Sequence, residues 1–197
     1  MSARRATVEY GAALVVLVTG GVLCLVAASR PWGEATVHDG LAATTTAVTG
    51  RDLFPLAPAV GLLAVAAVVA VPAARRVGRR VVGTVLVAAG LATALGSYGL
   101  ALELPARVMT WAERSGSTTG PVEEAIAEPN WARLTVLGGV LIAGAGLAVA
   151  VRGPRWPGMG TRYERDARAG EPRTDPPPTV TGRETWDALD RGDDPTA

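Results

Sequence analysis

The sequence predicts an all-α membrane protein whose core is a four-transmembrane-helix bundle. Four stretches are each apolar over about 18 to 22 residues and contain no Asp, Glu, Arg or His. A helix needs roughly 20 apolar residues to cross the hydrocarbon core of a bilayer. The four predicted spans cover residues 11–29, 54–74, 81–102 and 134–151. We therefore expect a transmembrane domain over residues 11–151, flanked by an N-terminal segment over residues 1–10 and a polar tail over residues 152–197.

The first span has two interpretations, because a signal peptide would have similar features. Arg4 and Arg5 precede the apolar stretch, and small residues close it at Ala27–Ser29. The apolar run is longer than the roughly 7–15 residues of a signal-peptide core. We therefore expect an uncleaved first transmembrane helix.

The distribution of arginines predicts the orientation in the membrane. All 19 basic residues are arginine. Those on one predicted side are Arg4, Arg5, Arg75, Arg76, Arg79, Arg80, Arg152 and Arg155. The short connection Arg75–Arg80 is densely basic, whereas the arginines on the other side are spread through the longer loops 30–53 and 103–133. Cytoplasmic loops carry the excess of basic residues. Both termini are therefore predicted to be cytoplasmic, with the two longer loops outside the cell membrane.

The two outer loops carry different local signals. In the first loop, β-branched residues at 35–37 and 43–48 flank a turn at 38–40, which predicts a small β-hairpin. The second loop predicts short helices at 106–113 and 122–127. Tryptophans beside the outer span ends are expected to act as interfacial anchors. These are Trp32, Trp111 and Trp131.

Small residues predict how the spans pack. Helix association in lipid depends on close backbone approach, which Gly and Ala permit. The small-xxx-small pairs are Ala57/Gly61, Ala92/Gly96, Gly139/Ala143, Gly144/Ala148 and Gly146/Ala150. The fourth span is richest in them and is expected to be a central, packed helix. The pattern leaves open whether these pairs act within one chain or in a homo-oligomer.

Composition argues against several classes of function. Ion-coupled transporters place ionisable groups at membrane depth, and the four spans contain none. The chain has one His and one Cys, with no metal-ligand spacing, phosphate-binding loop or nucleophile motif. We therefore expect no enzyme activity, no cofactor and no metal. The net charge of +1 and the low aromatic content also exclude the basic surface that nucleic acids require.

A few polar residues lie inside the predicted spans. Thr93 and Ser97 share one face of the third span at i, i+4 spacing, and Tyr98 is adjacent. One interpretation is hydrogen bonding to the preceding helical turn or to a neighbouring helix. The other is a lining for a small polar or aromatic solute. Cys24 is expected to be a small buried apolar residue.

The tail has the composition of a disordered segment, with many prolines and dense mixed charge. One patch differs, because Thr181 and Glu184 have capping-box spacing and Gly192 can terminate a short helix. Trp186 and Leu189 would then share one face at i, i+3. This pair is either a docking motif for a cytosolic partner or part of a transient turn.

Several motifs taken together resemble a known family. They are Ser29–Trp32, Val48–Leu53, the arginine-rich segment 75–80 and the closing segment Trp186–Thr196. The chain thereby resembles the actinobacterial tryptophan biosynthesis-associated membrane proteins, described as tryptophan-operon conserved hypothetical membrane proteins. The resemblance covers nearly the whole chain and implies the same number of spans. It implies no established activity, ligand or catalytic residue.

Two functional hypotheses follow. The first is a membrane accessory or scaffold protein associated with tryptophan biosynthesis. In this hypothesis Trp32, Thr49, Gly50 and Asp52 belong to a structured outer cap, and the tail around Trp186 recruits a cytosolic protein. The alternative is a facilitator of the transport of a neutral aromatic molecule such as tryptophan or indole. The lipid bilayer is the partner that both hypotheses require.

Overall fold

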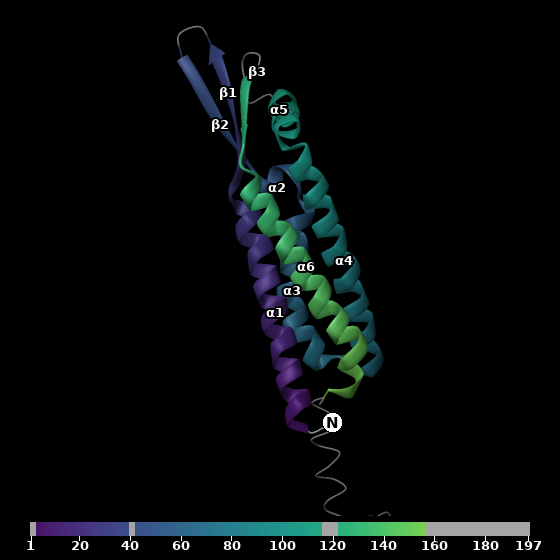
Figure 1. The fold of residues 1–197 in the computed structure, drawn as a ribbon. Coiled ribbons are helices and arrows are strands. Elements are labelled where there is room, and N and C mark those ends of the chain that lie inside the picture. The colour runs from purple at the N-terminus through teal and green to yellow at the C-terminus, as the bar shows by residue number, and fades with distance from the viewer. Residues whose placement is uncertain (1–2, 40–41, 116–121, 157–197) are drawn as a thin grey trace, which may run out of the picture. The chain divides into compact units, whose positions relative to one another are not determined.

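The computed structural model describes residues 3–39, 42–115 and 122–156, and they form a helical bundle with a small sheet beyond one end (Figure 1). The long helices are α1 (Ala3–Ser29), α3 (Leu56–Ala73), α4 (Arg76–Leu102) and α6 (Pro129–Arg152). The shorter elements are α2 (Gly50–Leu53), α5 (Leu104–Ser115), the 3-10 turn η1 (Gly153–Arg155), β1 (Pro31–Asp39), β2 (Ala42–Thr49) and β3 (Val122–Ala127). The four long helices have the length and apolar character needed to cross a membrane, which confirms the predicted bundle.

The four long helices alternate in direction and close into a ring (Figure 1). Helix α6 packs between α1 and α4, and these are its two main contacts. Helix α3 completes the ring by packing against α1 and, less extensively, against α4. The expectation that the fourth span is a packed helix is therefore confirmed.

Reciprocal glycine pairs hold the helices close together. In each pair, a Cβ atom built on either glycine would lie within 3.0 Å of the carbonyl oxygen of the other. The pairs are Gly20/Gly138 between α1 and α6, Gly21/Gly61 between α1 and α3, and Gly83/Gly146 and Gly90/Gly139 between α4 and α6. Because any side chain would separate the backbones, these contacts depend on glycine.

The small-xxx-small pairs contribute unequally to this packing. Glycines 61, 139 and 146 lie at helix contacts within the chain, one of the two arrangements that the pattern left open. Gly144 has no atom within 4 Å of an added Cβ, so its pair is not used within the chain. Gly96 instead accommodates the ring of Phe54, 2.6 Å from its added Cβ, and Ala92 is exposed.

The sheet has the order β2-β1-β3 and is antiparallel throughout. The predicted hairpin is confirmed, but its strands are longer than expected. His38 and Asp39, assigned to the turn, lie in β1 and pair with Ala43 and Ala42. The register of the β1–β2 pairing shifts between Pro31 and Gly33.

The expected helix at 122–127 is wrong, because this segment is the strand β3. It pairs with the free edge of β1, with Glu34 opposite Ile126 and Thr36 opposite Glu124. Edge pairing satisfies backbone groups along the strand, and this tertiary contact outweighs the helix preference of Glu and Ala. The other expected helix, at 106–113, is confirmed within α5.

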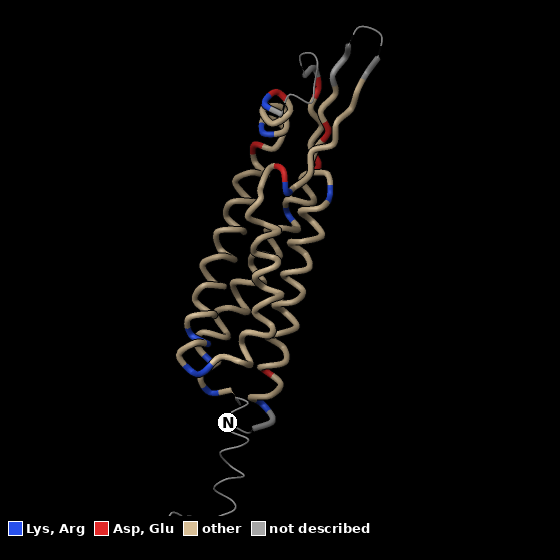
Figure 2. The backbone as a smooth tube through the Cα atoms, turned by 180° about the vertical axis from the view of Figure 1, so that it is seen from behind, with Lys and Arg blue, Asp and Glu red and all other residues tan. Residues whose placement is uncertain are grey.

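The helices also extend beyond the apolar stretches. The segment 75–80 was predicted to be a connection, but α4 already begins at Arg76 and only residues 74 and 75 separate it from α3. Arginine is a good helix former, and its aliphatic stem tolerates the membrane boundary. The arginines therefore occupy the first turns of a transmembrane helix. At the opposite end, basic and acidic residues are mixed (Figure 2).

Candidate functional site

The end of the bundle that carries the sheet has a compact cap, built from the two longer inter-helix segments. Its core consists of buried residues from the sheet, from α5 and from the start of α6: Trp32, Ala35, Val48, Leu104, Val108, Ala112 and Ala132. Gly33 lets α5 approach the sheet, because an added Cβ would lie 2.6 Å from a methyl group of Val108. We refer to this region, residues 30–53 and 104–132, as the cap.

Trp32 and Gly50 lie in direct contact at the centre of the cap. The indole of Trp32 is fully buried, and its Nε1 donates to the carbonyl oxygen of Ala27, 2.9 Å away. An added Cβ at Gly50 would collide with this indole and lie 2.9 Å from Cα of Ala28. The N–H of Gly50 donates to the carbonyl oxygen of Arg30 over 3.1 Å. The two motifs at the ends of the hairpin therefore form one structural unit.

Thr49 and Asp52 stabilise the start of the short helix α2, with Thr49 just before the helix and Asp52 in its first turn. The backbone N–H of Thr49 donates to the Asp52 carboxylate over 3.0 Å, and the Thr49 hydroxyl donates to the same carboxylate oxygen. These bonds form the capping interaction that stabilises the first turn of a helix. The four residues chosen from the sequence as a structured outer cap are thus brought together, although Trp32 is a core residue and not an exposed interfacial anchor.

The cap is also joined to the start of α6. The carbonyl oxygen of Trp32 accepts a hydrogen bond from the N–H of Glu128, 2.8 Å away. The guanidinium of Arg30 lies 5.5 Å from the ring centroid of Trp131, within the range of a cation–π contact. Trp111 and Trp131 are both half-buried against the cap core.

The polar residues of the third span do not form one surface. Thr93 and Ser97 are fully buried in the bundle, whereas 58% of Tyr98 is exposed on its outside. The Thr93 hydroxyl donates to the carbonyl oxygen of Ala89 over 2.9 Å, so it bonds back to its own helix. Within the described residues, the Ser97 hydroxyl has no hydrogen-bond partner. Cys24 is fully buried beside α6, with its sulfur 3.9 Å from the carbonyl oxygen of Thr135.

The end of the bundle opposite the cap contains a buried arginine whose burial the sequence did not predict. Arg79 is only 3% exposed, and its guanidinium donates to the carbonyl oxygens of Val71 at 3.0 Å and of Gly153 and Trp156 at 2.9 Å. It therefore connects the end of α3 to the turn after α6. The sequence predicted segment 75–80 as a connection, so it gave no sign that one of its arginines is buried.

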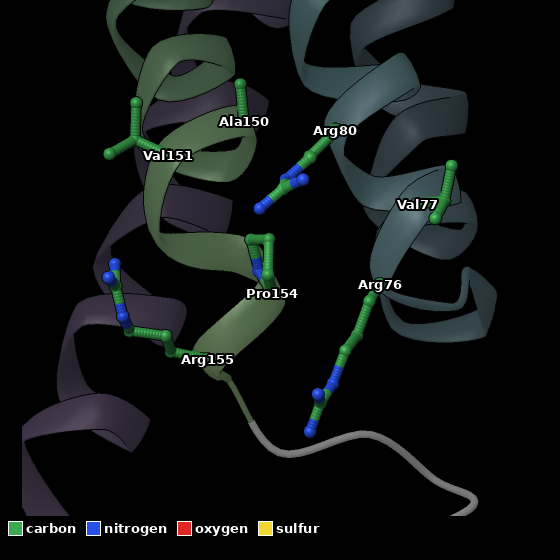
Figure 3. Close-up of a pocket in the computed structure, with 7 residues that line it drawn as sticks. All are labelled: Arg76, Val77, Arg80, Ala150, Val151, Pro154 and Arg155. Carbon is green, nitrogen blue, oxygen red and sulfur yellow. The ribbon is translucent and has the colours of Figure 1, made fainter.

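Next to Arg79 lies a half-open groove of about 700 Å³ between α4 and the end of α6. Its lining consists of Arg76, Val77, Arg80, Ala150, Val151, Pro154 and Arg155 (Figure 3). Three of these residues are cationic and none is acidic. In the sequence these arginines predicted orientation, and Arg76 and Arg80 also belonged to a family motif, but their pattern did not indicate a groove.

The remaining predictions concern the docking pair in the tail and metal ligands. Trp186 and Leu189 lie outside the described residues. Among the residues that the structure describes, no three His, Cys, Asp or Glu side chains gather as metal ligands.

These features define a small polytopic membrane protein with four transmembrane helices and a structured cap at one end. The sequence model for the family of tryptophan-associated transmembrane proteins matches residues 14–196, and the chain belongs to this family. The predicted resemblance is therefore confirmed. No curated protein and no solved structure matches the chain. The description of the family specifies a membrane protein associated with tryptophan and specifies no reaction.

Proposed function

We propose that the protein is a non-enzymatic accessory or scaffold protein of tryptophan biosynthesis in the cell membrane. The observation that carries this proposal is the fastened cap, in which Trp32 and Gly50 fix the hairpin to the end of α1. A cap held rigidly on a membrane bundle suits a protein that presents surfaces to partners. The family match supports the association with tryptophan.

The proposed orientation places the cap outside the cell and both termini in the cytoplasm. Arginines gather at the end of the bundle where α1 begins and α6 finishes (Figure 2). An excess of arginine marks the cytoplasmic side of a membrane protein. The tail after residue 156 would then be available to cytosolic proteins, and we propose that Trp186 and Leu189 recruit one.

The structure gives less support to a facilitator of tryptophan or indole transport. That hypothesis relied on Thr93, Ser97 and Tyr98 acting as one polar surface. Thr93 and Ser97 are enclosed in the bundle, and Tyr98 is on its outside. The neighbouring glycine pair Gly90/Gly139 brings the backbones of α4 and α6 together along the same stretch. Close backbone contact favours a structural role for this face over a solute path.

The test is crosslinking and affinity capture of the full chain from native membranes, followed by mass spectrometry. Replacing both Trp186→Ala and Leu189→Ala removes the two apolar side chains that a docking helix would present. We expect the wild type to enrich enzymes of tryptophan biosynthesis, and the double variant to lose at least about tenfold of that enrichment, which equals roughly 1.4 kcal/mol.

A matched control removes another aromatic side chain from the tail. Tyr163→Ala should retain the enrichment, and both variants should insert into membranes as the wild type does. An equal loss in the control, or unchanged enrichment in the double variant, would contradict the docking proposal. Capture that contains no tryptophan-pathway enzyme in any sample would contradict the accessory function itself.

A further inference from the structure

We propose that the groove between α4 and the end of α6 binds the phosphate headgroup of an anionic phospholipid. The groove has a volume of about 700 Å³ and opens at the arginine-rich end of the bundle. Its cationic residues are Arg76 and Arg80 on α4 and Arg155 on η1 (Figure 3). Basic pockets between transmembrane helices are a recognised type of site for phospholipid headgroups.

The charge of the groove favours an anion. Within the described part of the chain, the three guanidinium groups have no hydrogen-bond or ion-pair partner. The neighbouring Arg152 is different, because its Nε lies 3.9 Å from the carboxylate of Glu9. A guanidinium presents a planar set of donors that matches the oxygens of a phosphate. A phosphodiester would therefore satisfy both the charge and the donors.

The three cationic side chains leave the lining of the groove in different directions. Figure 3 shows Arg80 extending from α4 toward Pro154, while Arg76 extends past the start of the helix. Arg155 leaves η1 on the side of α6 that carries Val151, and its guanidinium points away from Arg76 and Arg80. Arg80 and Arg76 therefore supply the cations at the α4 wall, and Arg155 adds positive charge at the edge of the groove formed by η1.

Arg79 fixes these two walls relative to each other. Its backbone belongs to α4, and its guanidinium donates to the carbonyl oxygens of Gly153 and Trp156, on either side of Pro154 and Arg155. The walls are therefore positioned by a buried contact that involves no ligand. A site that is already arranged loses less conformational freedom when its ligand binds, and this favours affinity.

The apolar part of the lining favours a lipid over a soluble phosphate. Val77 is 71% exposed and Val151 is 58% exposed, although both lie on membrane-spanning helices. Exposed valines at this position suit contact with acyl chains, whereas inorganic phosphate would gain nothing from them. The combination of cations and exposed valines matches a phospholipid at the membrane boundary.

The experiment measures lipid retention by the purified full chain, using native mass spectrometry. The protein in detergent is offered equal amounts of phosphatidylglycerol and phosphatidylcholine. We expect preferential retention of phosphatidylglycerol by the wild type. We expect this preference to fall at least about tenfold in the triple variant Arg76→Gln, Arg80→Gln and Arg155→Gln. The single variant Arg80→Gln should lose less of the preference for phosphatidylglycerol. It remains a test of the groove even if the triple variant does not fold.

The matched control removes the same charge from the other end of the bundle, through Arg51→Gln, Arg114→Gln and Arg133→Gln. This control should retain the wild-type preference. An equal loss in both triple variants would overturn the proposal, because net charge alone would then explain binding. No preference in the wild type, or unchanged preference in Arg80→Gln and the groove triple variant, would also overturn it. Full competition by millimolar inorganic phosphate would assign the groove to free phosphate and not to lipid.

Discussion

The cap and the transmembrane bundle differ in the residues that set their closest contacts. The cap buries large side chains such as Trp32, Leu104 and Val108 around one apolar core. The bundle also buries large side chains such as Leu17, Leu86 and Ile142, but glycine pairs set the closest approach of its helices, where backbone atoms meet directly. Water drives large apolar groups into a core, whereas lipid is as apolar as the side chains and gives them no such drive. The difference in packing thus follows the solvent that each region meets.

The largest expected effect is in the cap. Trp32→Ala should destabilise the cap by about 3–5 kcal/mol, because it leaves a cavity where a fully buried indole was. It also removes the hydrogen bond to the carbonyl oxygen of Ala27. Hydrogen exchange of the β1 and β2 amides in detergent measures this loss. Ile126→Ala, at a half-exposed position of the same sheet, is the control and should change exchange far less.

A smaller effect is expected in the bundle. Gly139→Ala places a Cβ 2.7 Å from the carbonyl oxygen of Gly90 and should cost about 1–3 kcal/mol through overpacking. The control Gly144→Ala lies on the same helix with no atom within 4 Å of the added Cβ. It should be neutral or stabilising by up to about 1 kcal/mol, because alanine is the better helix former. Thermal unfolding in detergent compares them, and equal losses would contradict the assigned packing.

The smallest effect concerns the cap of helix α2. Asp52→Ala removes the acceptor for the Thr49 N–H and should cost about 0.5–2 kcal/mol. Asp52→Asn keeps an oxygen acceptor and should retain most of the stability. The midpoint of thermal unfolding measures both. If the two variants are equally destabilised, the charge of Asp52 matters and not the hydrogen bond.

The sequence predicted the bundle because the physical signal was local. Each long apolar run is sufficient by itself to indicate a span, and the family motifs at 29–32 and 48–53 pointed to the cap. Strand β3 was missed because its partner β1 is far away in the sequence and its own residues favour a helix. The burial of Arg79 was also missed because of sequence distance. Its acceptors Gly153 and Trp156 are 74 and 77 residues away along the chain.

The separation of Tyr98 from Thr93 and Ser97 shows why a shared helix face could not be predicted from adjacency in sequence. Neighbours in sequence on a helix diverge by about 100° per residue, so adjacency does not give a shared face. The candidate facilitator surface combined an i, i+4 pair with an adjacent residue, and only the pair lies together inside the bundle.

The position of α6 has a consequence for biosynthesis. Three of the four reciprocal glycine pairs include a residue of this helix: Gly138, Gly139 and Gly146. Ribosomes release it last among the long helices, and the strand β3 emerges just before it. The earlier helices therefore enter the bilayer before α6 is present, and their contacts with it form later. Closure of the ring and completion of the sheet can then occur only after β3 and α6 have been synthesised.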